Sequence, residues 1–328
     1  MILITGGLGF IGSHFASKIS QKENLVIVDN LSNSSVNIFF KLKMIAKKNI
    51  YFYEADIANF TKMQEIISTH KIHSIIHFAG LKSVGESFSF SARYYYNNVI
   101  GSKILFDLIK RNNIQNLIFS SSATVYGNPI KLPLDESHPI RAKNPYGQNK
   151  IDIENILLRD PYFQHDCSVK LLRYFNPIGA HPRGLIGESP KGIPNNLMPY
   201  ILMVAKREYQ KVSVFGNCYD THDGTGVRDY IHIMDLVDGH IKALNYQTKG
   251  ISIFNLGTGK GYSVLDLIKT FESVNHVSVP FEMTARRPGD VAAVYANPSK
   301  AESVLGFKAK QTLEDMCRDA WTFVKNNS

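Results

Sequence analysis

The chain begins with an apolar strand that runs directly into glycines, Ile2-Leu3-Ile4-Thr5-Gly6-Gly7-Leu8-Gly9-Phe10-Ile11-Gly12. Gly6, Gly9 and Gly12 have the spacing G-x-x-G-x-x-G between this strand and an amphipathic stretch over 11–22. In a strand–turn–helix unit, the first glycine permits a tight turn and the second lets the backbone approach a pyrophosphate. The third lets helix and strand pack closely, and the helix N-terminus offers free N–H groups to phosphate. The stretch therefore predicts a dinucleotide-binding βαβ unit.

Strands and helices alternate through the first half of the chain. Apolar runs predict strands at 2–5, 25–29, 50–53, 74–78, 116–120 and 169–174, with helical stretches near 11–22, 60–70, 93–111 and 145–160. This alternation favours an α/β fold, a Rossmann-type doubly wound parallel sheet. Beyond about Asn176, Pro- and Gly-rich loops separate short helices near 196–208, 234–246, 263–273 and 312–325. We predict a nucleotide-binding domain over 1–176 and a smaller mixed α/β substrate lobe over 177–328, between which the chain can cross back.

Composition and charge narrow the class of protein. The 328 residues are 44% hydrophobic and 20% charged, as in ordinary globular domains, and no apolar run approaches the ~18 residues of a membrane span. The net charge of +9 comes from lysines spread along the chain, whereas nucleic-acid binders gather theirs in a stripe or tail. We expect neither a nucleic-acid nor a membrane partner. An anionic small molecule fits the charge equally well.

Cysteines and histidines bear on location and on metal binding. Cys167, Cys218 and Cys317 are far apart and form no CxxC pair, which favours reduced thiols in a cytoplasmic protein. A strand that starts at Ile2 leaves no room for a signal peptide. The histidines show no ligand spacing, so packed or capping roles are favoured and no metal is expected.

Acidic residues after the second and third strands bear on the cofactor. Asp29 ends the second predicted strand, where a carboxylate can accept hydrogen bonds from a ribose diol and would repel a 2′-phosphate. Asn30 and Leu31 follow without a nearby arginine, which favours NAD over NADP. The alternative is that Asp29 only caps a turn. Asp56 and Ile57, after the third strand, could hold the adenine edge.

A hydroxyl cluster and a Tyr–Lys pair indicate catalysis. Ser120-Ser121-Ser122-Ala123-Thr124 follows the fifth strand, at the carboxyl edge where open sheets bind ligands. Of the 16 tyrosines, only Tyr146 has a lysine four residues later, Lys150, and this spacing puts both on one helix face. The ammonium should favour the phenolate and lower the pKa of Tyr146 from its usual value near ~10. Ser122 could hydrogen-bond a substrate alcohol beside it, although a turn-capping role remains open for that hydroxyl.

These motifs, in this order, resemble those of a known family. The chain is similar to the extended short-chain dehydrogenase/reductase superfamily and, within it, to the UDP-glucose (UDP-galactose) 4-epimerases, over essentially its whole length. The matching segments are Thr5–Gly12, His77–Lys82, Phe119–Gly127, Tyr146–Lys150, Leu172–Ala180, Gly192–Tyr200, Gly224–His232, Asn255–Gly257 and Arg286–Asp290. Gly192–Tyr200 and Gly224–His232 are more specific than the generic motifs of the superfamily.

The resemblance implies an isomerase that inverts C4 of a UDP-hexose. Tyr146 would take the 4-hydroxyl proton while Ser122 bonds the same oxygen, and hydride would pass to tightly bound, recycled NAD and return to the opposite face of a 4-keto sugar. Lys150 would tune Tyr146. The implied cofactor-binding residues are Gly6, Gly9, Phe10, Ile11, Gly12, Asp29, Asn30, Asp56, Ile57, Phe78, Ala79, Lys82, Asn97, Tyr146, Lys150 and Tyr174. The implied substrate-binding residues are Ser122, Thr124, Asn176, Asn196, Leu197, Phe215, Arg228, Arg287, Asp290 and Val294.

One position departs from the pattern of epimerases restricted to UDP-glucose and UDP-galactose. Those enzymes have a tyrosine four residues after the aspartate that corresponds to Asp290, and this chain has Val294 there, followed by Tyr295. A valine leaves room for an acetamido group, which predicts that UDP-N-acetylglucosamine and UDP-N-acetylgalactosamine are also accepted. The alternative is that Val294 is a core contact and Tyr295 fills the space.

Other functions remain as alternatives. A nucleotide-sugar 4,6-dehydratase would need an Asp-Glu pair where this chain has Ala123 and Thr124, and a reductase would need exchangeable NADPH. A non-catalytic NAD-binding regulatory protein could use the same scaffold. The resemblance also implies a homodimer through the helices near 93–111 and 145–160. Their apolar residues could equally belong to the core.

Overall fold

The structure, a computed structural model, describes residues 1–192, 194, 196–287 and 289–327. Ile193 and Asn195 of the Gly192–Tyr200 segment, and Pro288 of Arg286–Asp290, therefore lie outside the described residues. The chain forms two compact units. Unit 1 comprises residues 1–127, 139–173 and 237–254, and unit 2 comprises residues 128–138, 174–236 and 255–328.

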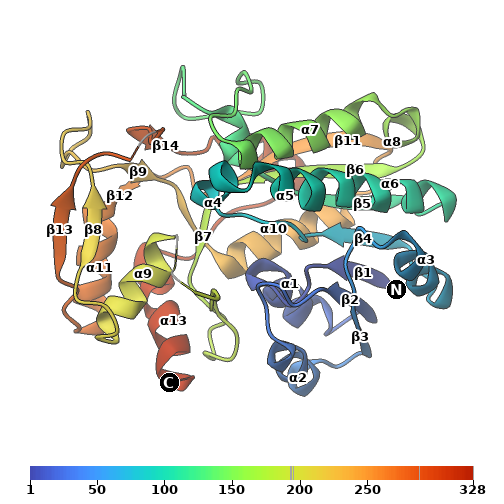
Figure 1. The fold of residues 1–328 in the computed structure, drawn as a ribbon, viewed down its shortest axis with the longest axis horizontal. Coiled ribbons are helices and arrows are strands. Elements are labelled where there is room, and N and C mark those ends of the chain that lie inside the picture. The colour runs from blue at the N-terminus through green and yellow to red at the C-terminus, as the bar shows by residue number, and fades with distance from the viewer. Residues whose placement is uncertain (193, 195, 288, 328) are drawn as a thin grey trace. The chain divides into compact units, whose positions relative to one another are not determined.

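Unit 1 is built on one seven-stranded sheet (Figure 1). Its strands are β1 (Ile2–Thr5), β2 (Leu25–Asp29), β3 (Ile50–Glu54), β4 (Ser74–His77), β5 (Asn116–Ser122), β6 (Ser168–Tyr174) and β11 (Gly250–Leu256), in the order β11-β6-β5-β4-β1-β2-β3. The pairs β1–β2, β2–β3, β1–β4 and β4–β5 are parallel. The expected Rossmann-type sheet is confirmed, and its strand order reverses between β1 and β4, where such sheets bind ligands.

Helices cover both faces of this sheet. On one side α1 (Phe10–Ile19) packs on α2 (Val36–Ile45), and its Phe15 contacts His240 of α10 (Ile233–Asn245). On the other side α6 (Gly101–Arg111) packs on α3 (Phe60–Thr69) and α7 (Pro145–Arg159). The strand order requires this arrangement, because right-handed crossovers change face where the sheet direction reverses. The shorter helices of unit 1 are α4 (Val84–Ser89), α5 (Ser91–Tyr95), the π-helix η1 (Tyr96–Ile100), the 3-10 helix η2 (Ala123–Tyr126) and α8 (Pro161–His165).

Within the described residues, unit 2 contains three small sheets and, besides the first residues of α10, four helices. The sheets pair β7 (Asn176–Ile178) with β10 (Tyr230–His232), β9 (Val227–Arg228) with β12 (Tyr262–Ser263) and β14 (Ala293–Val294), and β8 (Val212–Phe215) with β13 (Phe281–Thr284). The helices are α9 (Leu197–Ala205), α11 (Val264–Asn275), α12 (Ser299–Leu305) and α13 (Leu313–Asn326). The apolar faces of α9, α11 and α13 share one core, in which Phe271 of α11 meets Trp321 of α13. In the part of the chain that the structure describes, no helix has the length and apolarity to cross a bilayer.

Candidate active site

The glycine turn between β1 and α1 is closed by backbone contacts. Gly6 has a φ of 67°, and a Cβ added there would lie 2.7 Å from the amide nitrogen of Ala79. A Cβ added to Gly12 would lie 2.3 Å from the carbonyl oxygen of Gly6, so neither position admits a side chain. Helix α1 starts at Gly9 without a side-chain cap, which leaves N–H groups at its first turn for a phosphate. The turn fits the pyrophosphate of NAD, and Phe10 and Ile11 are half-buried beside it.

Asp29 at the end of β2 is buried and holds this turn. Its Oδ2 accepts a hydrogen bond from the Leu8 N–H at 3.0 Å. Its Oδ1 accepts from the Leu31 N–H at 3.0 Å and from the Ser34 hydroxyl at 2.7 Å. The turn-capping role that the sequence left open is therefore present. A ribose diol bound at Asp29 would share the carboxylate oxygens of Asp29 with the Ser34 hydroxyl.

The remaining predicted cofactor residues of unit 1 follow the carboxyl ends of β2, β3 and β4 or lie in η1; they are Asn30, Asp56, Ile57, Phe78, Ala79, Lys82 and Asn97. Asn30 donates to the Asp56 carboxylate at 3.0 Å. Asn97 lies in η1, and such π-helical turns often mark functional sites. Its neighbour Asn98, which sequence reasoning missed, is buried and bonds both the N–H and the carbonyl of Leu81, at 2.8 and 3.0 Å. Asn98 thereby fixes the loop after β4.

His77 at the end of β4 has a packed role. Its ring lies between the hydroxyls of Thr5 at 2.7 Å and Ser102 at 2.8 Å. Burial, with a smaller contribution from the charge of Lys150, lowers the pKa of His77 to about 3. The ring is therefore neutral and ties β1 to β4 and α6 beneath the glycine turn.

Ser122 and Tyr146 are brought together at the end of β5. The Ser122 Oγ accepts hydrogen bonds from the N–H and the hydroxyl of Thr124, at 3.2 and 3.0 Å. Its own hydrogen is then available to Tyr146, and Ser122 holds the pKa of that phenol below the value that burial alone would give. Tyr146 lies in the first turn of α7, which Asn144 caps by accepting from the Gly147 N–H at 2.8 Å. The strand end and the capped first turn thus place both hydroxyls at one point.

Lys150 lies one helical turn after Tyr146 and is buried. Its ammonium donates to the Ser120 carbonyl at 2.6 Å and lies 5.7 Å from the centroid of the Tyr146 ring. Burial lowers the pKa of Lys150 to about 8, against the opposing charge of Glu154.

The residues of the chain alone do not lower the pKa of Tyr146. Burial raises the pKa of Tyr146 to about 12, and the hydrogen bond from Ser122 opposes this rise. Desolvation disfavours the phenolate more than Ser122 favours it, and the expected lowering counted on the positive charge of NAD⁺ as well as on that of Lys150. A further positive charge is needed to make Tyr146 a base near neutral pH, and the oxidised nicotinamide of NAD has such a charge.

A buried ion pair anchors α7 one turn beyond Lys150. Glu154 is fully buried, and the Arg173 guanidinium on β6 donates to both of its oxygens, at 3.0 and 2.6 Å. The Ser121 hydroxyl also donates to Glu154, and Arg173 donates to the Tyr126 hydroxyl at 3.2 Å. Sequence reasoning missed this cluster, although Glu154 continues the four-residue spacing of Tyr146 and Lys150. Consecutive serines of β5 therefore bond consecutive turns of α7 and fix its register.

Several predicted substrate residues gather in unit 2 around β9. Arg228 pairs with Val294 across the β9–β14 ladder, and its guanidinium donates to the Val227 and Val291 carbonyls at 2.8 and 2.9 Å. The Asp290 carboxylate lies 3.8 Å from the same guanidinium. The structure therefore brings Arg228, Asp290 and Val294 into one group.

The other substrate residues lie on neighbouring elements of unit 2. The Arg287 guanidinium stacks on Phe215 at 3.7 Å from the ring centroid. Asn196 is exposed before α9 and donates to Glu188 at 3.1 Å, and half-buried Leu197 is the first residue of α9. The Asn176 side chain is exposed. Tyr174, predicted for the cofactor, is the buried last residue of β6, where the chain passes from unit 1 to unit 2.

Asp229, which follows Arg228, was not predicted and organises this region. Its buried carboxylate accepts from the N–H groups of Thr258, Gly259 and Ala296, at 2.8, 3.0 and 3.1 Å, and from the Thr258 hydroxyl. Burial raises the pKa of Asp229 and these bonds oppose the rise. The sequence signal that could have revealed this role of Asp229 is a charged residue inside an apolar segment.

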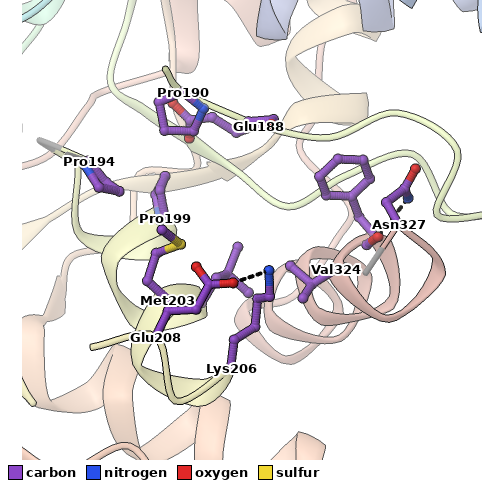
Figure 2. A pocket seen from close by; sticks show the side chains of 12 residues that line it. Glu188, Pro190, Pro194, Pro199, Met203, Lys206, Glu208, Val324 and Asn327 are labelled. Atoms are coloured by element: carbon purple, nitrogen blue, oxygen red, sulfur yellow. Dashed lines mark hydrogen bonds and ion pairs between the residues drawn. The ribbon is translucent and has the colours of Figure 1, made fainter. Parts of the chain in front are cut away.

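Two further features of unit 2 lie apart from the predicted residues. A cavity of about 260 Å³ between α9 and α13 contains none of them (Figure 2). Ligand atoms of His222, Asp223 and Asp266 lie within 4.8 Å of one another. Asp266 caps α11 there, and Asp223 accepts from Ser263 and Thr225, so both carboxylates already have structural roles.

Known proteins resemble the chain over nearly its whole length. A family model described as GDP-mannose 4,6 dehydratase matches residues 3–320. A UDP-glucose 4-epimerase of Yersinia enterocolitica is 50% identical over 99% of this chain and 98% of that protein. The UDP-glucose-4-epimerase of Stenotrophomonas maltophila, solved with NAD and formylated UDP-arabinopyranose, is 44% identical with a TM-score of 0.96, covering 99% of this chain and 98% of that one. The enzyme of Bifidobacterium longum with NAD⁺ and UDP has the same identity and coverage and a TM-score of 0.95.

Proposed function

The chain belongs to the UDP-glucose 4-epimerase family, within the extended short-chain dehydrogenases/reductases, and we propose that it inverts C4 of UDP-hexoses with Ser122, Tyr146 and Lys150 as its catalytic residues. The arrangement of these three residues supports the assignment most strongly. Two hydroxyls meet at the end of β5, and a buried ammonium lies one turn behind them.

Each residue has a defined task in this proposal. Tyr146 takes the proton of the sugar 4-hydroxyl and returns it to the same oxygen, and Ser122 donates a hydrogen bond to that oxygen. NAD held at the glycine turn and Asp29 would supply the acceptor, and later the donor, of the C4 hydride. Lys150 supplies a positive charge that favours the Tyr146 phenolate, and its bond to Ser120 keeps that charge in place.

The test is proton NMR of the protein with UDP-galactose, comparing the wild type with Tyr146→Phe. We expect the wild type to form the gluco epimer and the variant to lose about 10²- to 10⁴-fold in turnover, because it lacks the acid–base group. Tyr162→Phe removes a hydroxyl that bonds the Ile114 carbonyl in the same unit and should leave turnover unchanged. A Tyr146→Phe variant that folds and keeps most of its turnover would contradict the assignment.

The chain between Ser122 and Tyr146 disfavours the dehydratase alternative. A dehydratase would need an acid beside Ser122, where η2 places Ala123 and Thr124. Thr124 instead bonds Ser122, and a threonine cannot protonate a leaving hydroxyl as a carboxylic acid can. A non-catalytic role would leave UDP-galactose unchanged in the same NMR experiment.

We further infer that N-acetylated UDP-hexoses are substrates. Val294 is half-buried and paired with Arg228. A Cβ on Gly261 would lie 3.2 Å from the Tyr295 ring, so that ring packs over Gly261. This contact of the Tyr295 ring disfavours Tyr295 as a replacement for the missing ring at Val294.

A Val294→Tyr variant tests this inference. We expect turnover of UDP-N-acetylgalactosamine to fall at least about tenfold, because a phenol ring would occupy the space of the acetamido group, while turnover of UDP-galactose stays near that of the wild type. NMR of both substrates with the same enzyme preparation makes UDP-galactose the internal control. Equal loss on both substrates, or no wild-type turnover of the N-acetyl sugar, would refute the inference.

We also propose a cytoplasmic homodimer. Exposed apolar side chains lie on α4, α5, η1 and α7, which pack together in unit 1, and at Phe90 between α4 and α5; they are Val84, Phe88, Phe90, Tyr95, Tyr96 and Leu158. Tyr94, Leu105 and Leu108, which the sequence could not assign to core or interface, are fully buried. The exposed residues alone thus define the surface that a second copy would cover.

A further inference from the structure

Helix α2 has an exposed apolar row that no part of the proposed function uses. Val36, Phe40 and Met44 follow one another at four-residue spacing on one helix face, with exposed fractions of 38%, 57% and 80%. The opposite face is held in the fold by Leu42, which is fully buried. Helix α2 packs on α1 and lies beside β3, the edge strand of the sheet (Figure 1).

Only positive charges surround this row in the sequence. Residues 30–53 contain no aspartate or glutamate and include Lys41, Lys43, Lys47 and Lys48. On the helix, Lys43 and Lys41 fall on opposite flanks of the apolar row, and the Lys43 ammonium lies 5.7 Å from the centroid of the Phe39 ring. Lys47 and Lys48 are exposed just beyond the helix end, where their N–H groups donate to the Ser20 carbonyl. We call Val36, Phe40, Met44 and these four lysines the α2 face.

The composition of the α2 face matches one class of partner. A helix with an apolar row between lysines binds in the plane of a membrane interface, where apolar groups enter the acyl boundary and ammonium groups meet anionic headgroups. Phenylalanine and methionine also occur in protein interfaces, but such interfaces are depleted in lysine, whereas the α2 face contains four lysines and no acidic residue. A nucleic-acid duplex, which binds mainly through its phosphates, would gain nothing from the valine and methionine at the two ends of the row.

We propose that the α2 face binds the headgroup region of anionic lipid bilayers. The expectation of no membrane partner came from the lack of a spanning segment, and an interfacial helix needs none. With three apolar residues and four lysines, binding should be reversible and should require both the apolar row and the charge. It does not depend on the proposed catalytic residues, none of which lies in α2.

Co-sedimentation with vesicles tests this proposal. We expect the full-length protein to bind phosphatidylcholine vesicles only when they contain phosphatidylglycerol. Binding should weaken as ionic strength rises from about 0.01 to about 0.15 M, because the Debye length falls from about 30 to about 8 Å. Phe40→Ser/Met44→Ser and Lys47→Gln/Lys48→Gln should each reduce the partition coefficient by about tenfold or more.

Each variant has a matched control elsewhere in the chain. Phe281→Ser/Met283→Ser removes a similarly exposed apolar pair from β13, and Lys308→Gln/Lys310→Gln removes the same charge from another exposed pair. Both controls should bind as the wild type does, and all four variants should keep epimerase turnover in vesicle-free solution.

Three results would overturn the proposal. They are absence of binding to phosphatidylglycerol vesicles, equal losses in the variants and their controls, and dependence on the lysines without dependence on Phe40 and Met44. The last result would mean nonspecific adsorption by charge. Binding of duplex DNA, but not of vesicles, through the same lysines would assign the face to nucleic acid instead.

Discussion

Lys170 on β6 is buried without a counter-charge. It is 0% exposed and bonds Ser168 and, at 3.4 Å, the Asn116 side chain. No carboxylate among the described residues forms an ion pair with it. Burial lowers the pKa of Lys170 to about 8, against about 10.4 in an unfolded chain. The unfolded chain therefore holds the proton more tightly, and at neutral pH the buried charge costs about 3 kcal/mol.

We predict that Lys170→Met raises the free energy of unfolding at pH 7 by about 1–3 kcal/mol. The cost is complete below pH 8 and shrinks as pH rises from about 8 to about 10.4, because the folded chain then loses its proton first. The gain from the variant should accordingly be smaller at pH 9.5 than at pH 7. Urea denaturation at both pH values measures it, and a gain that does not depend on pH would contradict this account.

At the scale of elements, the Glu154–Arg173 pair links α7 to β6. Glu154→Ala would leave the Arg173 guanidinium buried and unpaired, which should cost about 3–5 kcal/mol of stability. Glu154→Leu/Arg173→Met removes both charges and should recover most of that loss. Chemical denaturation compares these variants with Glu65→Ala, which breaks an exposed pair with Lys62 on α3 and should cost less than about 1 kcal/mol. A double variant no more stable than Glu154→Ala would refute this explanation.

Elements whose apolar residues recur with a clear helical or strand period could be predicted from the sequence, and elements without such a period could not. The glycine turn, β1, β2 and α7 were located from patterns that local physics imposes. Helix α2 was missed because its apolar residues occupy both faces, the buried Leu42 and the exposed Phe40 and Met44. Strand β11 was missed because a late segment returns to the first sheet, a long-range pairing that no local pattern reveals. The Tyr146–Lys150 pair was found because its four-residue spacing is local, whereas the desolvation that raises the pKa of Tyr146 depends on the whole fold.

At the scale of the molecule, the exposed aromatic residues of α4, α5 and η1 determine the proposed assembly. Phe88, Tyr95 and Tyr96 are 59%, 46% and 60% exposed, and aromatic residues of this kind are typical of the centre of stable interfaces. We predict that light scattering after size-exclusion chromatography gives twice the 36.9 kDa mass of one chain. Phe88→Asp/Tyr96→Asp should give one chain mass, because an interface cannot bury two unpaired carboxylates, while Phe281→Asp on β13 should leave the dimer intact. A wild type that stays monomeric at micromolar concentration would refute the proposal. A double variant that stays dimeric would show that the interface lies on another surface.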